Sequence, residues 1–316
     1  MIYYLYKDTQ QELTCDSAST GILDAFSRGG CKVLSESEFL DSSIIPNHDD
    51  VIIIYISLKN EDCHNKLQST NCRKILHSMD ESKSDEILFR TQLEFCRRHR
   101  VDTMINTFPS KRNIDFLSSN GISTITMPFC GSPREIDFSK KDIDILVSGQ
   151  INEKYYPIRC KILSALKKSD IRYAYLQHSG IEASKVIHQY HGKNFHNLLD
   201  RCWLGVTCRA GSFRDRLVPK YVEFGFSKVL AVGDCPTYID PDMESSMVVV
   251  TEDSTHEEII TNIKNTLSDR KELIQRIERY SSIVHKNHDM DINVRRVLFM
   301  INNHQLDTAK YENSNQ

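Results

Sequence analysis

Glycines and basic side chains recur in the second half of the chain, at points where the sequence predicts a strand to end. The glycine-containing segments are Ser148-Gly149-Gln150, His178-Ser179-Gly180, Arg209-Ala210-Gly211-Ser212 and Gly233-Asp234-Cys235-Pro236. A glycine in such a turn lets the backbone approach a ligand closely, as a diphosphate at a helix N-terminus requires. The cations near the same edge are Arg159, Arg209, Arg214, Arg216 and Lys220. Cations gathered in this way within a slightly acidic protein predict a site for a phosphorylated small molecule.

Each of these residues also has a structural interpretation when it is taken alone. Any tight turn between a strand and a helix favours glycine. Arg159 could pair with Glu153 on the surface of a helix. Asp215 could simply neutralise its neighbours Arg214 and Arg216. It is the joint placement of these residues on one edge that favours a ligand site.

Composition and charge limit the class of protein. The chain has 316 residues, which corresponds to two domains of about 100–200 residues each. Its 40 Lys and Arg residues against 43 Asp and Glu give a net charge of −3. That balance lacks the basic excess of proteins that bind nucleic acid or anionic lipid, so we expect no nucleic-acid partner.

The sequence also bears on location and metal binding. The longest apolar run, residues 51–56, is far shorter than the roughly 20 residues of a membrane span. The N-terminus reaches Lys7-Asp8 too soon for a signal peptide. We therefore expect a cytoplasmic protein with reduced thiols and without a transmembrane segment. The nearest approach to a zinc pattern, Cys63-His64, Cys72 and His77, matches no common ligand spacing, so no metal site is predicted.

Strands alternate with helices along the first half of the chain. The predicted strands cover residues 2–6, 31–34, 51–57, 103–107 and 122–127. The predicted helices cover residues 20–27, 62–79, 85–98 and 112–119. Repetition of this kind favours a parallel sheet that is covered by helices on both faces.

The alternation stops at a segment rich in Pro and Gly, residues 128–133, and then restarts. The predicted strands cover residues 143–147, 171–176, 203–206, 229–232 and 247–251. The predicted helices cover residues 156–167, 182–200, 219–225, 257–267, 269–285 and 294–302.

The expected fold class is α/β, with two Rossmann-like domains that face each other across a cleft. Residues 1–135 form the first domain, residues 136–290 the second, and residues 291–316 a helix and tail that pack back on the first. The last helix has an apolar stripe at helical spacing: Val294, Val297, Leu298 and Ile301. A cleft is expected because open parallel sheets bind ligands outside the carboxyl ends of their strands.

Two motifs stand in the second half of the chain. The first consists of Asp144-Ile145-Leu146-Val147-Ser148-Gly149 followed by Tyr156-Pro157-Ile158-Arg159. The second is Val218-Pro219-Lys220-Tyr221-Val222-Glu223, which leads to a short strand near Ala231. Together they resemble the donor domain of glycosyltransferases with the GT-B fold, in particular the CgeB-like and group 1 glycosyltransferases. The resemblance covers about residues 133–251, and the first half is similar only in architecture, as expected for an acceptor domain.

The resemblance implies roles for single residues. Glu223 would accept hydrogen bonds from the ribose hydroxyls of a nucleotide sugar. Lys220 and Arg159 would face its diphosphate as the catalytic cations. Gly149 and Gly211 would let the backbone approach the phosphates or the sugar. The other donor-binding residues would be Tyr156, His178, Arg209 and Asp215.

The implied activity is transfer of a sugar from a nucleotide-diphosphate sugar to an acceptor hydroxyl, such as that of a glycan or glycoconjugate. Such a hexosyl- or pentosyltransferase needs no bound metal and no cofactor besides the donor. An inverting mechanism needs a base, and Asp8, just past the first strand, is the candidate catalytic residue for it. The acidic pair Asp215 and Glu223 favours retention, although Asp215 stands where related retaining enzymes carry a longer Glu.

Three other interpretations stay open. A metal-dependent glycosyltransferase would hold Mg²⁺ or Mn²⁺ with an Asp-x-Asp motif. Three such motifs occur: Asp142-Ile143-Asp144, Asp240-Pro241-Asp242 and Asp289-Met290-Asp291. A non-catalytic nucleotide- or sugar-binding module could use the same fold. So could a nucleotide-sugar epimerase, which needs no acceptor. The donor base, the acceptor and the oligomeric state have no signal in the sequence.

Overall fold

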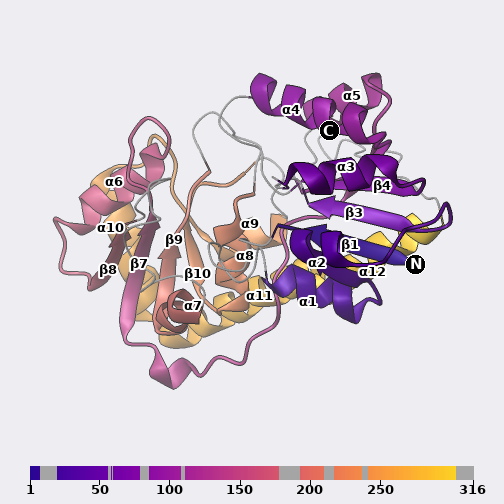
Figure 1. The fold of residues 1–316 in the computed structure, drawn as a ribbon. Coiled ribbons are helices and arrows are strands. Elements are labelled where there is room, and N and C mark those ends of the chain that lie inside the picture. The colour runs from indigo at the N-terminus through magenta and orange to yellow at the C-terminus, as the bar shows by residue number, and fades with distance from the viewer. Residues whose placement is uncertain are drawn as a thin grey trace. The chain divides into compact units, whose positions relative to one another are not determined.

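The computed structural model describes residues 1–7, 20–55, 58, 60–78, 85–107, 111–177, 193–209, 217–236 and 241–303 (Figure 1). These residues form two compact units. Unit 1 contains the described residues up to Pro128 and those from Met290 onward, and unit 2 contains Phe129–Asp289. Each unit is built around one parallel sheet, which confirms the predicted α/β class.

The sheet of unit 1 has six parallel strands in the order β2-β1-β3-β4-β5-β6. The strands are β1 (Ile2–Tyr6), β2 (Lys32–Ser35), β3 (Val51–Tyr55), β4 (Arg73–Ser78), β5 (Thr103–Asn106) and β6 (Ser123–Thr126). The helices are α1 (Thr20–Arg28), α2 (Glu36–Asp41), α3 (Glu61–Ser69), α4 (Asp85–His99), α5 (Lys111–Ser119) and α12 (Met290–Asn302).

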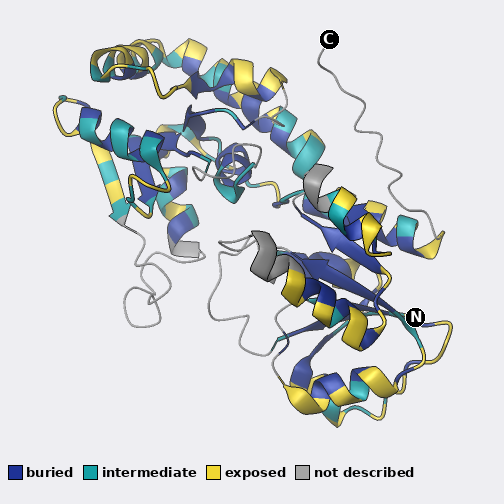
Figure 2. Cartoon of the chain, turned by 90° about the horizontal axis from the view of Figure 1, so that it is seen from above, coloured by how far each residue is buried: buried dark blue, intermediate teal, exposed yellow. Residues whose placement is uncertain are grey.

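Helices cover both faces of this sheet, which is why its inner strand β3 is apolar almost throughout. The three isoleucines of β3 are fully buried, and Figure 2 shows buried strands beneath helices whose outer faces are exposed. On one face, Ile54 packs in a cluster with Phe39 of α2. On the other face, Tyr4 lies against Phe26 of α1, with ring centroids 4.4 Å apart.

The sheet of unit 2 has five parallel strands in the order β11-β10-β9-β7-β8. The strands are β7 (Ile143–Gly149), β8 (Tyr173–Gln177), β9 (Cys202–Val206), β10 (Leu230–Gly233) and β11 (Val248–Val249). The helices are α6 (Pro157–Leu166), α7 (Lys193–Asp200), α8 (Pro219–Phe226), α9 (Pro241–Ser246), α10 (His256–Ser268) and α11 (Arg270–His288), with a 3₁₀ turn at Phe138–Lys140.

The last helix, α12, belongs to unit 1, where it packs on α1 and β6. Its apolar stripe is buried there: Val294, Val297, Leu298 and Ile301. Two polar contacts hold it there, since Arg28 pairs with Asp291 near the start of α12 at 2.7 Å and Arg296, in its middle, donates to the Thr126 carbonyl at 2.6 Å. The chain thus enters unit 2 after Pro128 and returns to unit 1 at Met290.

The prediction of one helix over residues 62–79 is wrong. Helix α3 ends at Ser69, and β4 follows as an inner strand between β3 and β5. The backbone N–H of Thr70 closes the helix on the Leu67 carbonyl, and its hydroxyl donates to the same carbonyl at 2.7 Å. Ile75 and Leu76 of β4 are both fully buried because helices cover each face of the sheet. Burial on both faces removes the alternation by which a strand is recognised.

The other predicted elements agree with the structure within a few residues, and two short helices, α2 and α9, were not predicted. Of the helix predicted over residues 182–200, only the part from Lys193 is described, as α7. In the described ranges no helix combines the length and the apolar character that crossing a membrane would require.

Candidate functional site

The strand order of unit 2 reverses between β7 and β9. From β7 the chain moves to β8 on one side, and then to β9 on the other. Ligands of open parallel sheets bind at such a switch point, outside the carboxyl ends of the strands. Here those ends are Ser148-Gly149 of β7 and Thr207-Cys208 after β9, and Val147 and Val206 are register partners just before them.

A turn and an arginine meet at the end of β7. Gly149 has φ +103°, a conformation that favours glycine, and an added Cβ would lie 2.8 Å from Nη1 of Arg159. Arg159, in the first turn of α6, is 4% exposed and donates from Nη1 to the Gln150 carbonyl at 2.9 Å. Its guanidinium lies over the Tyr156 ring, 4.4 Å from the centroid. The arginine is thus held against the glycine turn and does not pair with Glu153.

The switch point has hydrogen-bonding capacity that the described residues do not use. Ser148 Oγ, Arg159 Nε and Thr207 Oγ1 are enclosed and have no hydrogen-bond partner within the described ranges. Buried polar atoms are usually paired with protein or ordered water. Burial raises the pKa of the Cys208 thiol to about 11, and the nearby Arg159 guanidinium opposes that rise. The ends of β7 and β9 and the start of α6 therefore form one polar region.

Helix α8 carries the second motif beside the end of β10. Pro219 occupies its first turn, where a missing N–H costs nothing. Lys220 and Glu223 are three residues apart and so lie on neighbouring parts of one helix face. The Lys220 ammonium lies 5.4 Å from the centroid of the Phe195 ring, and Glu223 is buried. Tyr221 ties the helix to the loop after β10, because its hydroxyl donates to the Asp234 carbonyl at 2.6 Å.

Arg209 and Asp234 join the loops that follow β9 and β10. The Asp234 carboxylate accepts from the Arg209 backbone N–H at 3.0 Å and from its Nε at 2.6 Å. Burial raises the pKa of Asp234 above its usual value, and the hydrogen bonds from Arg209 oppose that rise. Sequence reasoning selected Arg209 and missed Asp234 as a site residue. A usable signal was present, since a buried strand ends in Gly233 and an acid follows it directly.

The structure places the predicted site residues in two groups. Six lie on unit 2 near the carboxyl ends of its strands: Gly149, Tyr156, Arg159, Arg209, Lys220 and Glu223. Four lie outside the described residues, and their roles stay predictions: Asp8, His178, Gly211 and Asp215.

The first Asp-x-Asp motif lies at the opposite end of β7. Asp142 pairs there with Arg201, with Arg201 Nη2 2.5 Å from a carboxylate oxygen. Asp144 pairs with Arg172 at 3.2 Å and with Arg270 at 3.3 Å. Arginines already neutralise both carboxylates, so this motif is poorly suited to hold a divalent cation at the switch point. Within the described ranges, no three or more His, Cys, Asp or Glu side chains converge as metal ligands do.

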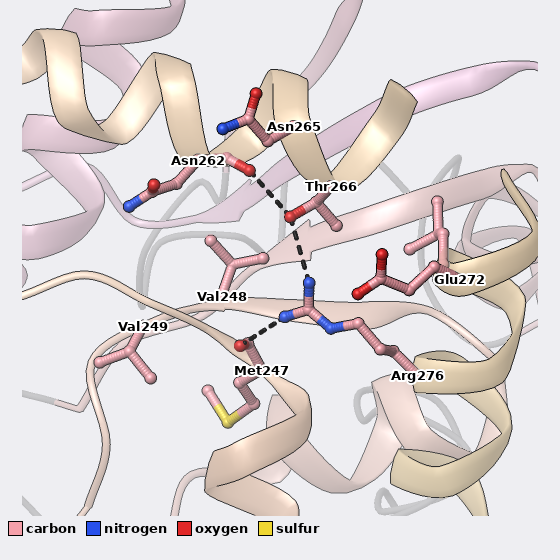
Figure 3. A pocket seen from close by; sticks show the side chains of 9 residues that line it. Met247, Val248, Val249, Asn262, Asn265, Thr266, Glu272 and Arg276 are labelled. Carbon is pink, nitrogen blue, oxygen red and sulfur yellow. Dashed lines mark hydrogen bonds between the residues drawn. The ribbon is translucent and has the colours of Figure 1, made fainter. Parts of the chain in front are cut away.

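A pocket of about 360 Å³ lies elsewhere in unit 2, between α10, α11 and the edge strand β11 (Figure 3). Arg276 crosses it and donates to the carbonyls of Ser246 and Met247 and to the Thr266 hydroxyl, at 3.2, 2.8 and 3.3 Å. Strand β10 separates this edge from β9 and the switch point. The pocket is therefore no part of the candidate site, and Arg276 serves to close the C-terminal end of α9.

Replacing Arg276 by alanine is expected to lower the free energy of unfolding by about 1–3 kcal/mol, because the carbonyls of two buried residues, Ser246 and Met247, lose a donor. Urea unfolding measures the change. Arg279→Ala is the matched control, since Arg279 is exposed on the same helix and its loss should change stability by less than about 0.5 kcal/mol. Equal effects of the two substitutions would contradict the role of Arg276.

Comparison with solved structures defines the fold. An alpha-glucosyltransferase in complex with UDP matches with a TM-score of 0.64 and 11% identity, over 95% of this chain and 99% of that chain. HepE of Anabaena in complex with UDP-glucose matches with a TM-score of 0.63 and 9% identity, over 96% and 99%. A trehalose-6-phosphate synthase matches with a TM-score of 0.53 and 13% identity, over 85% and 76%. These neighbours are GT-B glycosyltransferases. This chain has the GT-B fold.

The GT-B fold that the two sequence motifs predict is thus confirmed. No model of a protein family matches the sequence. A search of curated proteins finds no match either. The narrower resemblance to the CgeB-like group stays a prediction.

One of these neighbours is known in complex with a nucleic acid. The alpha-glucosyltransferase also forms complexes with a 13-mer DNA and with DNA containing an abasic site. Our expectation of no nucleic-acid partner rested on a net charge of −3. An identity of 12–13% shows the fold alone, so for this chain that expectation stays a prediction.

Proposed function

We propose that this chain is a glycosyltransferase that moves a hexosyl or pentosyl group from a nucleoside-diphosphate sugar to a hydroxyl of an acceptor. The observation that carries the proposal is the Arg159 guanidinium held against the Gly149 turn at the switch point of unit 2. It supplies a fixed positive charge where open parallel sheets bind their ligands. The neighbours support the proposal through their complexes with UDP and UDP-glucose, which make uracil the first base to test.

The chemistry required is control of charge. As the bond between the anomeric carbon and the diphosphate oxygen breaks, the nucleoside diphosphate gains negative charge and the sugar becomes oxocarbenium-like. Arg159 and the N-terminus of α6 would stabilise that negative charge, as would Lys220 in the first turn of α8. Groups that are oriented before the reaction stabilise the transition state without a reorganisation cost.

Glu223 would hold the nucleoside. An ionised carboxylate only accepts hydrogen bonds, so ribose hydroxyls are suitable donors to it. Glu223 lies one helical turn after Lys220, so a single helix would present the carboxylate to the pentose and the ammonium to the phosphate. This spacing suits a nucleoside diphosphate, in which the pentose and the phosphates are neighbours.

In this proposal the reaction needs no bound divalent metal and proceeds with retention. The first statement is supported by the paired Asp142 and Asp144 at the far end of β7, and activity that survives EDTA would support it further. The second depends on Asp215 acting beside Glu223. If the sugar is transferred with inversion, Asp8 is the candidate base.

Binding of nucleoside diphosphates tests the proposal without knowledge of the acceptor. UDP at 100 times its Kd is expected to raise the free energy of unfolding by about 2.7 kcal/mol. A thermal-shift series with UDP, ADP, GDP, CDP and TDP, followed by calorimetry, measures the effect and identifies the base. If none of these five diphosphates binds, the proposal is refuted.

Turnover separates the alternatives. A transferase is expected to release UDP slowly from a UDP-sugar in the absence of an acceptor, because water takes the place of the hydroxyl. A non-catalytic module would bind the donor and release nothing. An epimerase would convert the sugar with the diphosphate bond intact, which proton NMR of the donor detects.

A further inference from the structure

Asp234 holds Arg209 at two points. Its carboxylate accepts from the Arg209 backbone N–H and from the guanidinium Nε, at 3.0 and 2.6 Å. A side chain that is tied to its own main chain through a common partner has few rotamers left. The two residues are 25 positions apart in the sequence and lie after adjacent strands, β9 and β10.

Two buried hydrogen bonds connect the backbone of Asp234 to helices α8 and α11. The Tyr221 hydroxyl donates to the Asp234 carbonyl at 2.6 Å, and the Tyr280 hydroxyl of α11 donates to the Tyr221 carbonyl at 2.8 Å. Both tyrosines are fully buried. Through these contacts α11 and α8 determine the position of the loop after β10, and this loop determines the position of Arg209.

The energetics of the pair favour a role beyond stability. The side chains of Arg209 and Asp234 are 22% and 7% exposed. Desolvation of two charges largely offsets their attraction, so a buried ion pair adds little net stability compared with apolar residues. What such a pair does supply is a fixed direction for the charged side chain of Arg209. Arg209 directly follows Cys208 at the switch point. The Arg159 guanidinium is near the Cys208 thiol, where it opposes the rise in pKa that burial causes.

We propose that Asp234 is a positioning residue that orients Arg209 toward the diphosphate of the bound donor. The inference rests on the proposed function and adds to it a third cation, Arg209, and the carboxylate that fixes its direction. Asp234 itself does not touch the ligand, because its two oxygens accept from Arg209 and one of them also lies 3.3 Å from the Tyr221 hydroxyl.

Asp234→Asn tests this with minimal change of shape. The amide oxygen can still accept from the Arg209 backbone N–H, but the amide NH₂ then faces the Nε–H, so two donors oppose each other. UDP affinity is expected to fall about tenfold or more, because a hydrogen bond to a charged group is worth about 1.5–3 kcal/mol. Calorimetry with UDP measures Kd, and thermal unfolding is recorded on the same samples.

A double-mutant cycle shows whether Asp234 acts through Arg209. Arg209→Met keeps the apolar stem and is expected to lose as much affinity as Asp234→Asn, and the double variant should lose no more than either alone. Asp144→Asn is the matched control, because it breaks an arginine pair at the opposite end of β7 and should leave Kd unchanged.

The outcomes separate the inference from the function on which it rests. If wild-type protein binds UDP and Asp234→Asn binds it equally well with a lower melting temperature, the carboxylate is only structural and the inference fails. If Asp234→Asn does not fold, Arg209→Met decides, and wild-type affinity in that variant overturns the inference. Failure of the wild-type protein to bind any nucleoside diphosphate instead refutes the proposed function.

Discussion

Arg159→Ala is expected to lower the rate of sugar transfer by about 10²–10³-fold while the protein stays folded. The guanidinium is enclosed, lies over the Tyr156 ring and is directed by its bond to the Gln150 carbonyl. A cation held in this way is already oriented when negative charge develops on the leaving diphosphate. Its loss therefore removes stabilisation of the transition state more than it weakens binding of the donor. Release of nucleoside diphosphate from the donor measures the rate, and circular dichroism checks the fold.

Arg172→Ala is the matched control for this experiment. Arg172 is also in unit 2, but its side chain is 73% exposed and pairs with Asp144 at the amino end of β7. Its removal should leave the rate unchanged. An unchanged rate in Arg159→Ala, or an equal loss in both variants, would show that Arg159 has no part in the reaction.

Gly149→Ala tests the same cation without altering it. Alanine at this position is strained at φ +103°, and its Cβ would lie 2.8 Å from Nη1 of Arg159. The guanidinium must then move from its place at the end of β7. The rate of sugar transfer is therefore expected to fall, as it does in Arg159→Ala.

Acidification from pH 7 to pH 4 is expected to destabilise unit 1 by about 3 kcal/mol through His77 alone. His77 of β4 is fully buried, with Nδ1 2.8 Å from the Tyr4 hydroxyl, and its Nε2 has no hydrogen-bond partner within the described ranges. Burial lowers the pKa of His77 from 6.5 to about 3. The folded protein thus keeps the ring neutral at pH 4, whereas the unfolded chain takes up a proton below about pH 6.5.

The sign follows from the number of protons bound. Between the two pKa values the unfolded state binds more protons, so the free energy of unfolding falls by about 1.4 kcal/mol per pH unit as the pH drops. Urea unfolding at pH 7 and pH 4 measures this loss. His77→Gln takes up no proton at this position, so its free energy of unfolding should fall less between pH 7 and pH 4 than that of the wild type. His48→Gln should behave like the wild type, because His48 is 77% exposed. If His77→Gln has the same pH dependence as the wild type, the role of His77 is refuted.

Local patterns were sufficient for most of the fold. The apolar run of β3 and the switch from strand to helix after Gly149 are visible in the sequence because neighbouring residues produce them. The helix predicted over residues 62–79 is wrong at residues 73–78, because β4 is an inner strand and its pattern does not alternate. Its identity as a strand depends on helices that cover it from elsewhere in the chain.

In the candidate site, too, some features depend on residues close together in the chain and others depend on the tertiary structure. The sequence by itself determined the α/β class and the motif that brings Arg159 against Gly149, since both depend on residues close together in the chain. Only the tertiary structure decided which strands are neighbours. The order β10-β9-β7 places Thr207 next to Ser148 and Asp234 next to Arg209. Hydrogen bonds between strands form through backbone groups that all residues share, so strand order depends on packing of the whole unit and leaves little trace in local sequence.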